Sequence, residues 1–444
     1  MVYAQKLNKI PDFLPVPGQD VFNYLAADYA SNHQLHMVIT FEGHLCQELL
    51  AKSFRLTMDI EPVLGCRFDE QPESACWKRR TDLDYLNLCP VLETEQPEKE
   101  LRDFIALPTD SRKDPLVQAK IFRTQCRDIL CIKMDHACSD GGGLKEYVYL
   151  LSEVYNHQCS QRPYPVPLNP TRCDGRRFLK QFGIEDPSQA WDPSQTPPGP
   201  IWSFPCKSYR NTGPAFIKRS ISRHLFHSMK AFAEQQRVTI NDLLLTAYYR
   251  ALFKLSRMPE NQPAPVMVTV DLRQYMPEGS QIRAVNFSSA FNVLLPYIEG
   301  ESFLESLRHV ARLTSNLKES HGEIPIAVIL ELYGIMGLSE ARRWFESARK
   351  QSIDTNLATP HLSNIGVINK LIFGNLSAAE GYIVTPAMYA PGFMLGASTY
   401  SHVLTLVVNY YTSDIEEELV QSFLNYMVSG LEECISHLVP ELST

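Results

Sequence analysis

The stretch from Cys131 to Tyr155 reads CIKMDHACSDGGGLKEYVYLLSEVY. It continues the apolar, β-prone run DILCIKM, which predicts a strand over 128–134. Three glycines then precede a helical pattern, and glycine favours neither element. We therefore expect the glycines to mark a backbone with positive φ or a close approach of another segment. The apolar face predicted for the helix consists of Leu144, Tyr147, Val148, Leu151, Val154 and Tyr155.

The polar loop of this stretch places two side chains suited to chemistry at a strand end. A histidine with a pKa near 6.5 accepts protons at neutral pH, and a rigid strand would hold His136 and Asp140 in place. The alternative is that His136 is a buried histidine satisfied by the fold. Cys138 is an alternative nucleophile, although residues two apart seldom form a usable pair. The glycines fit neither a phosphate-binding nor a dinucleotide-binding loop, because the spacing of both motifs is absent.

The composition is that of a globular protein with a sizeable core. The chain has 444 residues, of which 44% are hydrophobic and 21% charged, and this excludes a disordered chain. Lys and Arg number 42 against 50 Asp and Glu, which gives a net charge of −8. Because nucleic acids and anionic membranes attract basic surfaces, we expect neither as a partner.

The cysteines and the apolar segments indicate where the protein works. Eleven cysteines are scattered without a C-x-x-C pair, which predicts reduced thiols and no metal site. The N-terminus lacks a signal-peptide pattern. The longest apolar region, Ile324 to Leu338, contains Glu331 and is too short to span a bilayer. We expect a cytoplasmic monomer without a membrane span.

Prolines divide the chain into two parts. Eleven of the thirty prolines lie between Gln161 and Pro214, where an even distribution gives about four. Such a stretch sustains neither a long helix nor a central strand. We interpret it as a crossing over 176–214 between an N-terminal lobe over 1–175 and a C-terminal lobe over 215–444. A long surface loop within one domain is the alternative.

Each predicted lobe mixes strands and helices, so the predicted fold class is α+β. Further strands are predicted over 36–41, 266–270 and 402–410. Further helices are predicted over 45–58, from Thr239 to Leu255, and over 414–437. Thr239 is expected to cap its helix, because Asp242 stands at the third position of a capping box.

The segment Asp135 to Gly141, DHACSDG, resembles the His-His-x-x-x-Asp-Gly motif of a large superfamily. This is the condensation-domain and chloramphenicol-acetyltransferase-like acyltransferase superfamily. It includes nonribosomal peptide synthetase condensation domains, wax ester synthases, alcohol acetyltransferases and polyketide-associated acyltransferases. The likeness continues in matching order along nearly the whole chain, in EPVLGCRF (61–68), VTINDLLLTA (238–247), DLRQYMP (271–277), VNF (285–287) and SNIG (363–366).

The resemblance implies two chloramphenicol-acetyltransferase-like lobes in a V, in agreement with the proline-rich crossing. Donor and acceptor would enter the channel between the lobes from opposite faces, and two such lobes can rock against one another. The family's catalytic residue, the second histidine of the motif, maps onto His136. Asp140 and Gly141 map onto the structural end of the motif, where the carboxylate is expected to pair with an arginine. Arg273 matches the family's arginine, and its rivals as the partner are Arg67 and Arg283.

The first motif position departs from the family, because Asp135 replaces a histidine. That position is not the base in the family, so the change does not imply a loss of activity. It does count against a strict peptide synthetase condensation domain, as does the missing carrier or adenylation region. Candidates for lining the channel are Asp135, Asn286, Ser288 and Asn364.

The function implied by the resemblance is an acyltransferase of secondary metabolism, which transfers groups other than aminoacyl groups. The donor would be a thioester of coenzyme A or of a carrier protein, acting as a co-substrate without any cofactor. The acceptor would be a small-molecule hydroxyl or amine, with His136 as the general base. A stand-alone condensation enzyme that joins carrier-bound substrates is one alternative, and a catalytically silent scaffold that binds an acyl chain or a protein is another. An acidic carrier would need a basic patch, for which the sequence offers Arg172, Arg176, Arg177 and Lys180.

Overall fold

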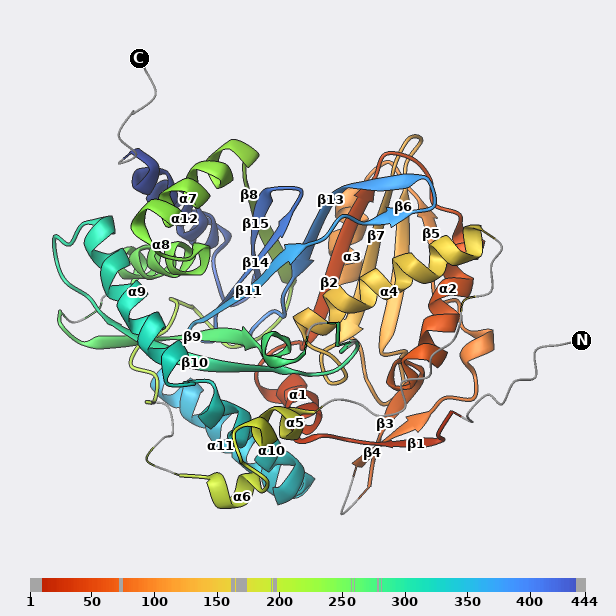
Figure 1. The fold of residues 1–444 in the computed structure, drawn as a ribbon, viewed down its shortest axis with the longest axis horizontal. Helices are drawn as coiled ribbons and strands as arrows, with labels where there is room; N and C mark the ends of the chain where they lie inside the picture. The colour runs from red at the N-terminus through yellow and green to blue at the C-terminus, as the bar shows by residue number, and fades with distance from the viewer. Residues whose placement is uncertain are drawn as a thin grey trace, which may run out of the picture.

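The computed structural model describes residues 10–71, 75–160, 164, 174–192, 194, 198–256, 258, 260–277, 279–280 and 282–436. Two lobes, each built on a six-stranded sheet, are set at an angle to one another as a V (Figure 1). The predicted α+β class and the two-lobed architecture are confirmed.

The sheet of the N-terminal lobe has the strand order β12-β13-β2-β7-β6-β5. Its strands are β2 (Gln34–Phe41), β5 (Val91–Glu93), β6 (Val117–Arg123), β7 (Asp128–Asp135), β12 (Ile372–Phe373) and β13 (Leu376–Val384). Helices α2 (Gln47–Ile60) and α4 (Gly141–Cys159) cover one face, and α3 (Pro97–Ala106) covers the other (Figure 1). Because both faces are covered, β2 and β7 are buried at every position.

The segment from Cys131 to Tyr155 folds as predicted. The strand predicted over 128–134 is β7, and the whole apolar face predicted for the following helix is buried in α4. The predicted helix over 45–58 corresponds to α2, and the predicted strand over 36–41 corresponds to β2.

The sheet of the C-terminal lobe has the strand order β10-β9-β11-β14-β15-β8. Its strands are β8 (Pro214–Ile221), β9 (Pro263–Asp271), β10 (Ser288–Pro296), β11 (His361–Ile368), β14 (Met394–Tyr400) and β15 (Val403–Tyr411). The helices that pack into its core are α7 (Arg223–Gln236), α8 (Ile240–Leu255), α9 (Phe303–Glu319) and α12 (Glu417–Ser436). The capping box is confirmed, because Thr239 Oγ1 accepts from the N–H of Asp242 at 3.1 Å and the Asp242 carboxylate accepts from the N–H of Thr239 at 2.8 Å.

Strands β12 and β13 depart from the expected lobe boundaries. They lie within 215–444, yet β13 pairs with β2 of the N-terminal lobe, with Tyr382 opposite Val38 and Val384 opposite His36. Residues 215–444 therefore do not form a lobe by themselves. The exchange covers the backbone groups of β2, which would otherwise form an open edge of the N-terminal sheet. The period of a strand shows which side chains are buried, but not which sheet the strand joins.

The helices at the base of the V connect the two lobes. They are α1 (Gly18–Tyr29), α5 (Gly175–Gln181), α6 (Pro187–Ala190), α10 (Ile324–Met336) and α11 (Leu338–Thr355). Helix α1 packs on α10 and α11, and the short helices α5 and α6 of the crossing pack on α10 (Figure 1). Residues 165–173 of the proline-rich stretch, including Arg172, lie outside the described residues. Within the part of the chain that the structure describes, no helix is long and apolar enough to cross a membrane.

A small sheet fixes the position of α1 beneath the junction of the lobes. It has the order β1-β4-β3, formed by β1 (Phe13–Pro15), β3 (Cys66–Glu70) and β4 (Ala75–Arg79). Tyr24 of α1 stacks on Phe68 with 3.7 Å between the ring centroids. Trp77 Nε1 donates to Asp20 Oδ2 of α1 at 2.8 Å, which directs the Asp20 side chain into the interior.

Candidate active site at the junction of the lobes

A tight turn carries the chain from β7 into α4 and displays His136. The N–H of Cys138 donates to the carbonyl oxygen of Asp135 at 3.2 Å, which closes the turn. The N–H of His136 donates to the carbonyl oxygen of His33 at 2.9 Å, which ties the turn to the residue that precedes β2. The backbone of His136 is thus held from two sides.

Asp140 ends this turn and joins the two lobes. It is the N-cap of α4, because its Oδ1 accepts from the N–H of Gly143 at 2.6 Å. Its Oδ2 accepts from the N–H of Phe287 at 2.7 Å, and its Oδ1 lies 3.0 Å from Arg273 Nη1. Phe287 and Arg273 belong to the C-terminal lobe, so this one carboxylate starts a helix of one lobe and binds the backbone of the other.

Arg273, the partner expected from the resemblance, pairs with Asp140. Its side chain also donates to the carbonyl oxygens of Ile282 at 2.9 Å and Val285 at 3.0 Å. Burial by itself would raise the pKa of Asp140, but the charge and hydrogen bonds of Arg273 outweigh it and hold the pKa below 3.8. Of the two rival arginines, Arg67 is exposed on β3, and the described contacts of Asp140 include neither it nor Arg283.

The three glycines allow another segment to approach the backbone closely, and they are not needed for a positive φ. None of them has a positive φ. A Cβ on Gly141 would lie 2.6 Å from Ile365 Cδ1, and one on Gly142 would lie 2.7 Å from Arg273 Nη1. A Cβ on Gly143 would lie 2.9 Å from the carbonyl oxygen of Val285. Glycine is therefore required because the first turn of α4 packs directly against the other lobe.

Asn286 sets the tautomer of His136. The two protons on its Nδ2 are shared among three acceptor oxygens at 3.0 Å, namely Asp20 Oδ1 and the carbonyl oxygens of His136 and Ala137. These bonds fix the orientation of the amide, so Asn286 Oδ1 must face His136 Nδ1, at 3.3 Å, as an acceptor. Nδ1 consequently carries the ring proton, and Nε2 keeps the lone pair that a general base needs. The sequence interpretation placed Asn286 on the channel wall, whereas in the structure it is 3% exposed and lies against His136.

The environment of His136 keeps its ring neutral. Burial lowers the pKa of His136 below 6.5, although Asp140, Asn286 and Asp20 act in the opposite direction. At neutral pH the imidazole is therefore available as a proton acceptor. The nearby carboxylates Asp140 and Asp20 favour the imidazolium that would form when it takes up a proton.

A cavity of about 100 Å³, here called the His136 cavity, opens beside the base between the lobes. Asp140 and Gly141 reach its wall from the N-terminal lobe, and Ser288 and Asn364, both predicted to line the channel, reach it from the C-terminal lobe. The other lining residues are Leu35, Gly142, Thr269, Val270, Asp271, Ser363, Ile365, Thr385, Pro386 and Met394. The predicted site residues from distant parts of the sequence thus converge on one space.

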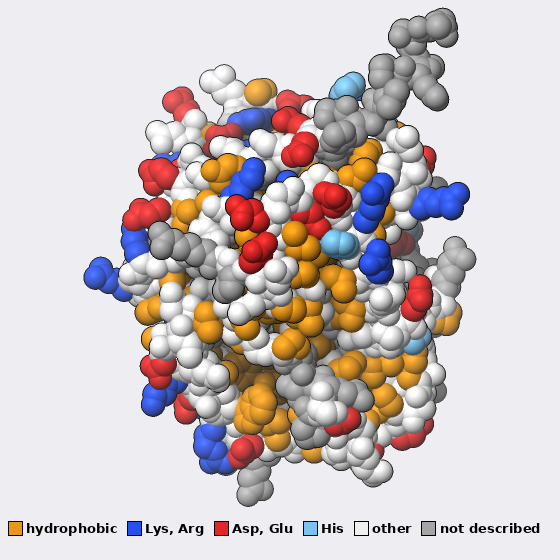
Figure 2. Space-filling view, turned by 90° about the vertical axis from the view of Figure 1, so that its left-hand side faces the viewer, with side chains coloured by type: hydrophobic (Ala, Val, Ile, Leu, Met, Phe, Trp, Pro, Cys, Tyr) orange, Lys and Arg blue, Asp and Glu red, His pale blue; other side chains and the backbone are white. Residues whose placement is uncertain are grey.

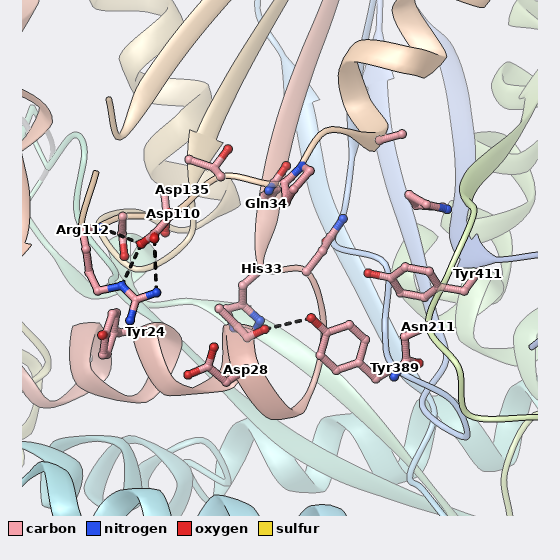
Figure 3. A pocket seen from close by; sticks show the side chains of 17 residues that line it. Tyr24, Asp28, His33, Gln34, Asp110, Arg112, Asp135, Asn211, Tyr389 and Tyr411 are labelled. Atoms are coloured by element: carbon pink, nitrogen blue, oxygen red, sulfur yellow. Dashed lines mark hydrogen bonds and ion pairs between the residues drawn. The ribbon is translucent and has the colours of Figure 1, made fainter. Parts of the chain in front are cut away.

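Asp135 belongs to a second cavity. Successive residues of a strand point to opposite sides, and accordingly Gln34 and Asp135 line a cavity of about 410 Å³, whereas Leu35 and His136 line the His136 cavity. We call the larger space the Asp135 cavity (Figure 3). Burial raises the pKa of Asp135 to about 7, and the carboxylates of Asp110 and Asp114 add to the effect, while the hydrogen bond from the N–H of Ala137 acts against it.

Two residues of this site were missed by the sequence interpretation. His33 lies between the cavities, with its ring centroid 5.1 Å from that of His136. Its φ of 45° is unusual for a non-glycine residue, and Ser31 and Asn23 hold its ring by hydrogen bonds. Asp20, the acceptor from Asn286, is an unremarkable acid in a helical pattern. No local sequence signal distinguishes either residue, because their roles arise from tertiary contacts.

The thiol of Cys138 does not fit the role of a nucleophile. Cys138 is 0% exposed within the core of the N-terminal lobe, and its Sγ lies 3.2 Å from the carbonyl oxygen of Asp135. Reactive cysteines are partly exposed and lie in electropositive surroundings. His136 therefore remains the candidate reactive group of the loop.

Comparison with known proteins identifies the family. The family profile described as "Condensation domain" matches residues 22–260, more than half of the chain. The chain belongs to the condensation-domain family. A search of curated protein sequences gives no match.

Three solved structures illustrate the shared fold. The first condensation domain of the calcium-dependent antibiotic synthetase, in complex with a substrate analogue, has a TM-score of 0.71 at 15% identity, covering 96% of both chains. The trichothecene 15-O-acetyltransferase of Fusarium sporotrichioides has a TM-score of 0.67 at 12% identity, covering 94% of both chains. The starter condensation domain of rhizomide synthetase, in complex with C8-CoA, has a TM-score of 0.66 at 14% identity, covering 96% of this chain and 95% of that one.

The buried ion pair predicts a large loss of stability when one partner is removed. Asp140→Ala and Arg273→Ala should each lower the free energy of unfolding by about 3–5 kcal/mol, because each leaves a buried charge without its partner. The double variant should cost less than the sum of the two. Urea denaturation of the four proteins measures this coupling. Lys99→Ala, which breaks the exposed pair of Lys99 with Asp103, is the control and should leave the midpoint unchanged. Additive losses would show that the pair is not coupled.

The raised pKa of Asp135 predicts a pH-dependent stability difference. Between about pH 4 and 7 the folded state holds a proton on Asp135 that the unfolded state releases, so this carboxyl makes the fold less stable as the pH rises. Asp135→Asn should therefore match the parent near pH 4.5 and exceed it at pH 8 by on the order of 2–4 kcal/mol. Urea denaturation at both pH values checks this, with Asp28→Asn as the control. An equal difference at both pH values would contradict the assignment.

Proposed function

We propose that the protein transfers an acyl group from a thioester donor to a hydroxyl or amine acceptor, with His136 as the general base. The observation that carries the proposal is the hydrogen bond between His136 Nδ1 and Asn286 Oδ1. It leaves Nε2 unprotonated on a ring that lines a cavity between the lobes.

The proposed reaction needs a single proton acceptor. Nε2 of His136 takes the proton of the acceptor as its oxygen or nitrogen attacks the thioester carbonyl carbon. The tetrahedral intermediate then collapses, the C–S bond breaks, and the departing thiolate receives the proton from Nε2. No acyl-enzyme is required, since the thioester is already activated. Asp140 and Asp20 stabilise the transient imidazolium by their charge, and the burial of the site strengthens that interaction.

The comparisons support this proposal in two respects. One protein of the same fold is a 15-O-acetyltransferase, and another is a condensation domain in complex with C8-CoA. Acyl transfer to oxygen and the use of a coenzyme A thioester are therefore both compatible with the fold. We propose coenzyme A thioesters as the donors, acting as co-substrates.

Replacing the base should reduce catalysis without unfolding the protein. His136→Ala is expected to lower turnover at least about a hundredfold, because general base catalysis contributes roughly 10²–10⁴-fold.

The parent should lose activity towards acidic pH with a midpoint below 6.5, since burial lowers the pKa of His136 and only the neutral ring accepts a proton. Release of free thiol from a panel of acyl-coenzyme A and acyl-carrier donors, with alcohol and amine acceptors, measures both effects. His44→Ala, at an exposed histidine, is the matched control. Near-normal transfer by His136→Ala would refute the role of the base, and silence of the parent with every donor would favour a non-catalytic scaffold.

The donor can be identified through the basic residues of the crossing. Arg176 Nε lies 3.4 Å from the buried carboxylate of Glu331. This ion pair stabilises the fold, so Arg176 is not mutated in the experiment below. Arg177 and Lys180 are exposed on α5. Acidic and basic side chains are interspersed over much of the face of the C-terminal lobe shown in Figure 2.

Reversing the two exposed charges should leave the rate with free acyl-coenzyme A unchanged. The double variant Arg177→Glu, Lys180→Glu is compared with Arg102→Glu, Arg223→Glu, which reverses two exposed arginines elsewhere. Thiol release is followed with acyl-coenzyme A and with the corresponding acyl-carrier protein. If only carrier-bound donors react, and the first double variant alone abolishes the reaction with strong salt dependence, the enzyme is instead a stand-alone condensation enzyme.

A further inference from the structure

The Asp135 cavity has a charge distribution that the proposed reaction does not explain. It lies beside α1, which contributes Tyr24, Ala27 and Asp28 to its wall (Figure 3). Its wall consists of Tyr24, Ala27, Asp28, Asn32, His33, Gln34, Ala106, Pro108, Thr109, Asp110, Ser111, Arg112, Asp135, Asn211, Pro214, Tyr389 and Tyr411. With a volume of about 410 Å³ it can hold a small polar molecule.

Two of the three carboxylates on this wall are already neutralised. Arg112 binds both oxygens of Asp110, at 2.8 and 3.1 Å, as the dashed lines of Figure 3 show. Asp28 lies 3.3 Å from Arg342 at the rim. Asp135 remains. Its Oδ1 accepts from the N–H of Ala137 at 2.9 Å, and among the described residues no basic side chain forms an ion pair with it.

Two acceptor atoms on this wall have no hydrogen-bond partner among the described residues. Asp135 is only 6% exposed, yet it lines the cavity and its Oδ2 has no hydrogen-bond partner among the described residues. Asn211 Oδ1, on the same wall, is buried and likewise has no partner within the described part of the chain. The hydroxyl proton of Tyr389 is donated to the carbonyl oxygen of Ala27 at 2.9 Å, and that of Tyr24 to Glu70 at 2.7 Å. A ligand that complements these two acceptors brings hydrogen-bond donors, and a positive charge on it compensates the carboxylate of Asp135.

We propose that the Asp135 cavity binds an acyl acceptor that carries a protonated amine, such as an amino alcohol or a diamine. The ammonium group supplies three donors and compensates the charge of Asp135. The rings of Tyr389 and Tyr411, whose centroids are 5.7 Å apart, offer aromatic faces that attract the cation. The proposal rests on the proposed function and deepens it, because it names the class of the acceptor.

His33 relates this cavity to the base. It lines the Asp135 cavity, and its ring centroid lies 5.1 Å from that of His136. An acceptor anchored at Asp135 by its ammonium group can extend its other end past the ring of His33 towards His136. That end bears the hydroxyl or neutral amine that loses its proton to Nε2. The ammonium group is an anchor and takes no part in the bond changes.

The experiment measures binding without any donor. Isothermal titration calorimetry at pH 8 compares 4-amino-1-butanol with 1,4-butanediol, which has the same length and no charge. The parent should bind the amino alcohol at least about tenfold more tightly than the diol, because the diol lacks the charge that Asp135 requires. Asp135→Asn should abolish that preference and leave diol binding unchanged. Asp28→Asn removes a carboxylate of the same cavity that already has a partner, and should retain the preference.

Three outcomes would overturn the proposal. These are equal affinity of the parent for the two compounds, absence of amino alcohol binding, and retention of the preference by Asp135→Asn. The titratable and charged side chains around Asp135 are Asp110, Asp114, Arg112, Asp28, His33, Tyr24, Tyr389 and Tyr411. A control titration at pH 5.5 should show weaker binding, because Asp135 becomes protonated. If the binding experiment fails in one of these ways, thiol release in the transferase assay is still expected. Conversely, amine binding without acyl transfer would count against the proposed function alone.

Discussion

The ion pair of Asp140 with Arg273 is the constraint on which the site depends. Its groups come from different lobes. Asp140 is buried and the side chain of Arg273 is only 13% exposed, so removing either charge would leave the other poorly solvated and without a partner. The carboxylate simultaneously caps α4 and binds the N–H of Phe287. This arrangement draws the start of α4 against the loop at 282–287, and only glycine fits the narrow gap. Asn286 lies in that loop, so the pair also brings to His136 the residue that sets its tautomer.

Asp135 and Asp140 are five residues apart, and their different environments give them different protonation behaviour and different roles. Arg273 holds the pKa of Asp140 low, and this residue serves as a permanent anion that fixes the loop. Burial without a cation raises the pKa of Asp135 to about 7, and this residue faces a cavity. Keeping a carboxyl group with a pKa near 7 buried costs stability. Such shifted pKa values are typical of functional rather than structural positions. The same sequence motif thus contains a structural anion and a candidate recognition group.

The sequence predicted those features that local pattern or matching motif order determines. Strand β7, the buried face of α4 and the capping box at Thr239 follow from periodicity and hydrogen-bonding chemistry within a few residues. The role of Asn286 does not follow from local pattern. An amide is equally suited to a channel wall, and three acceptors from distant parts of the sequence orient it here. The place of β13 was missed for a related reason, since the partner of a strand is chosen by distant segments.

The strand exchange changes how the two lobes can move. A proline-rich crossing alone would let them rock freely, but β13 lies in the N-terminal sheet and β14 in the C-terminal sheet. The segment that joins these strands, 385–393, must bend with any change in the angle between the lobes. Thr385 and Pro386 in this segment line the His136 cavity, and Tyr389 lines the Asp135 cavity. Opening of the V therefore alters both cavities at once, so that the His136 cavity and the Asp135 cavity are mechanically coupled.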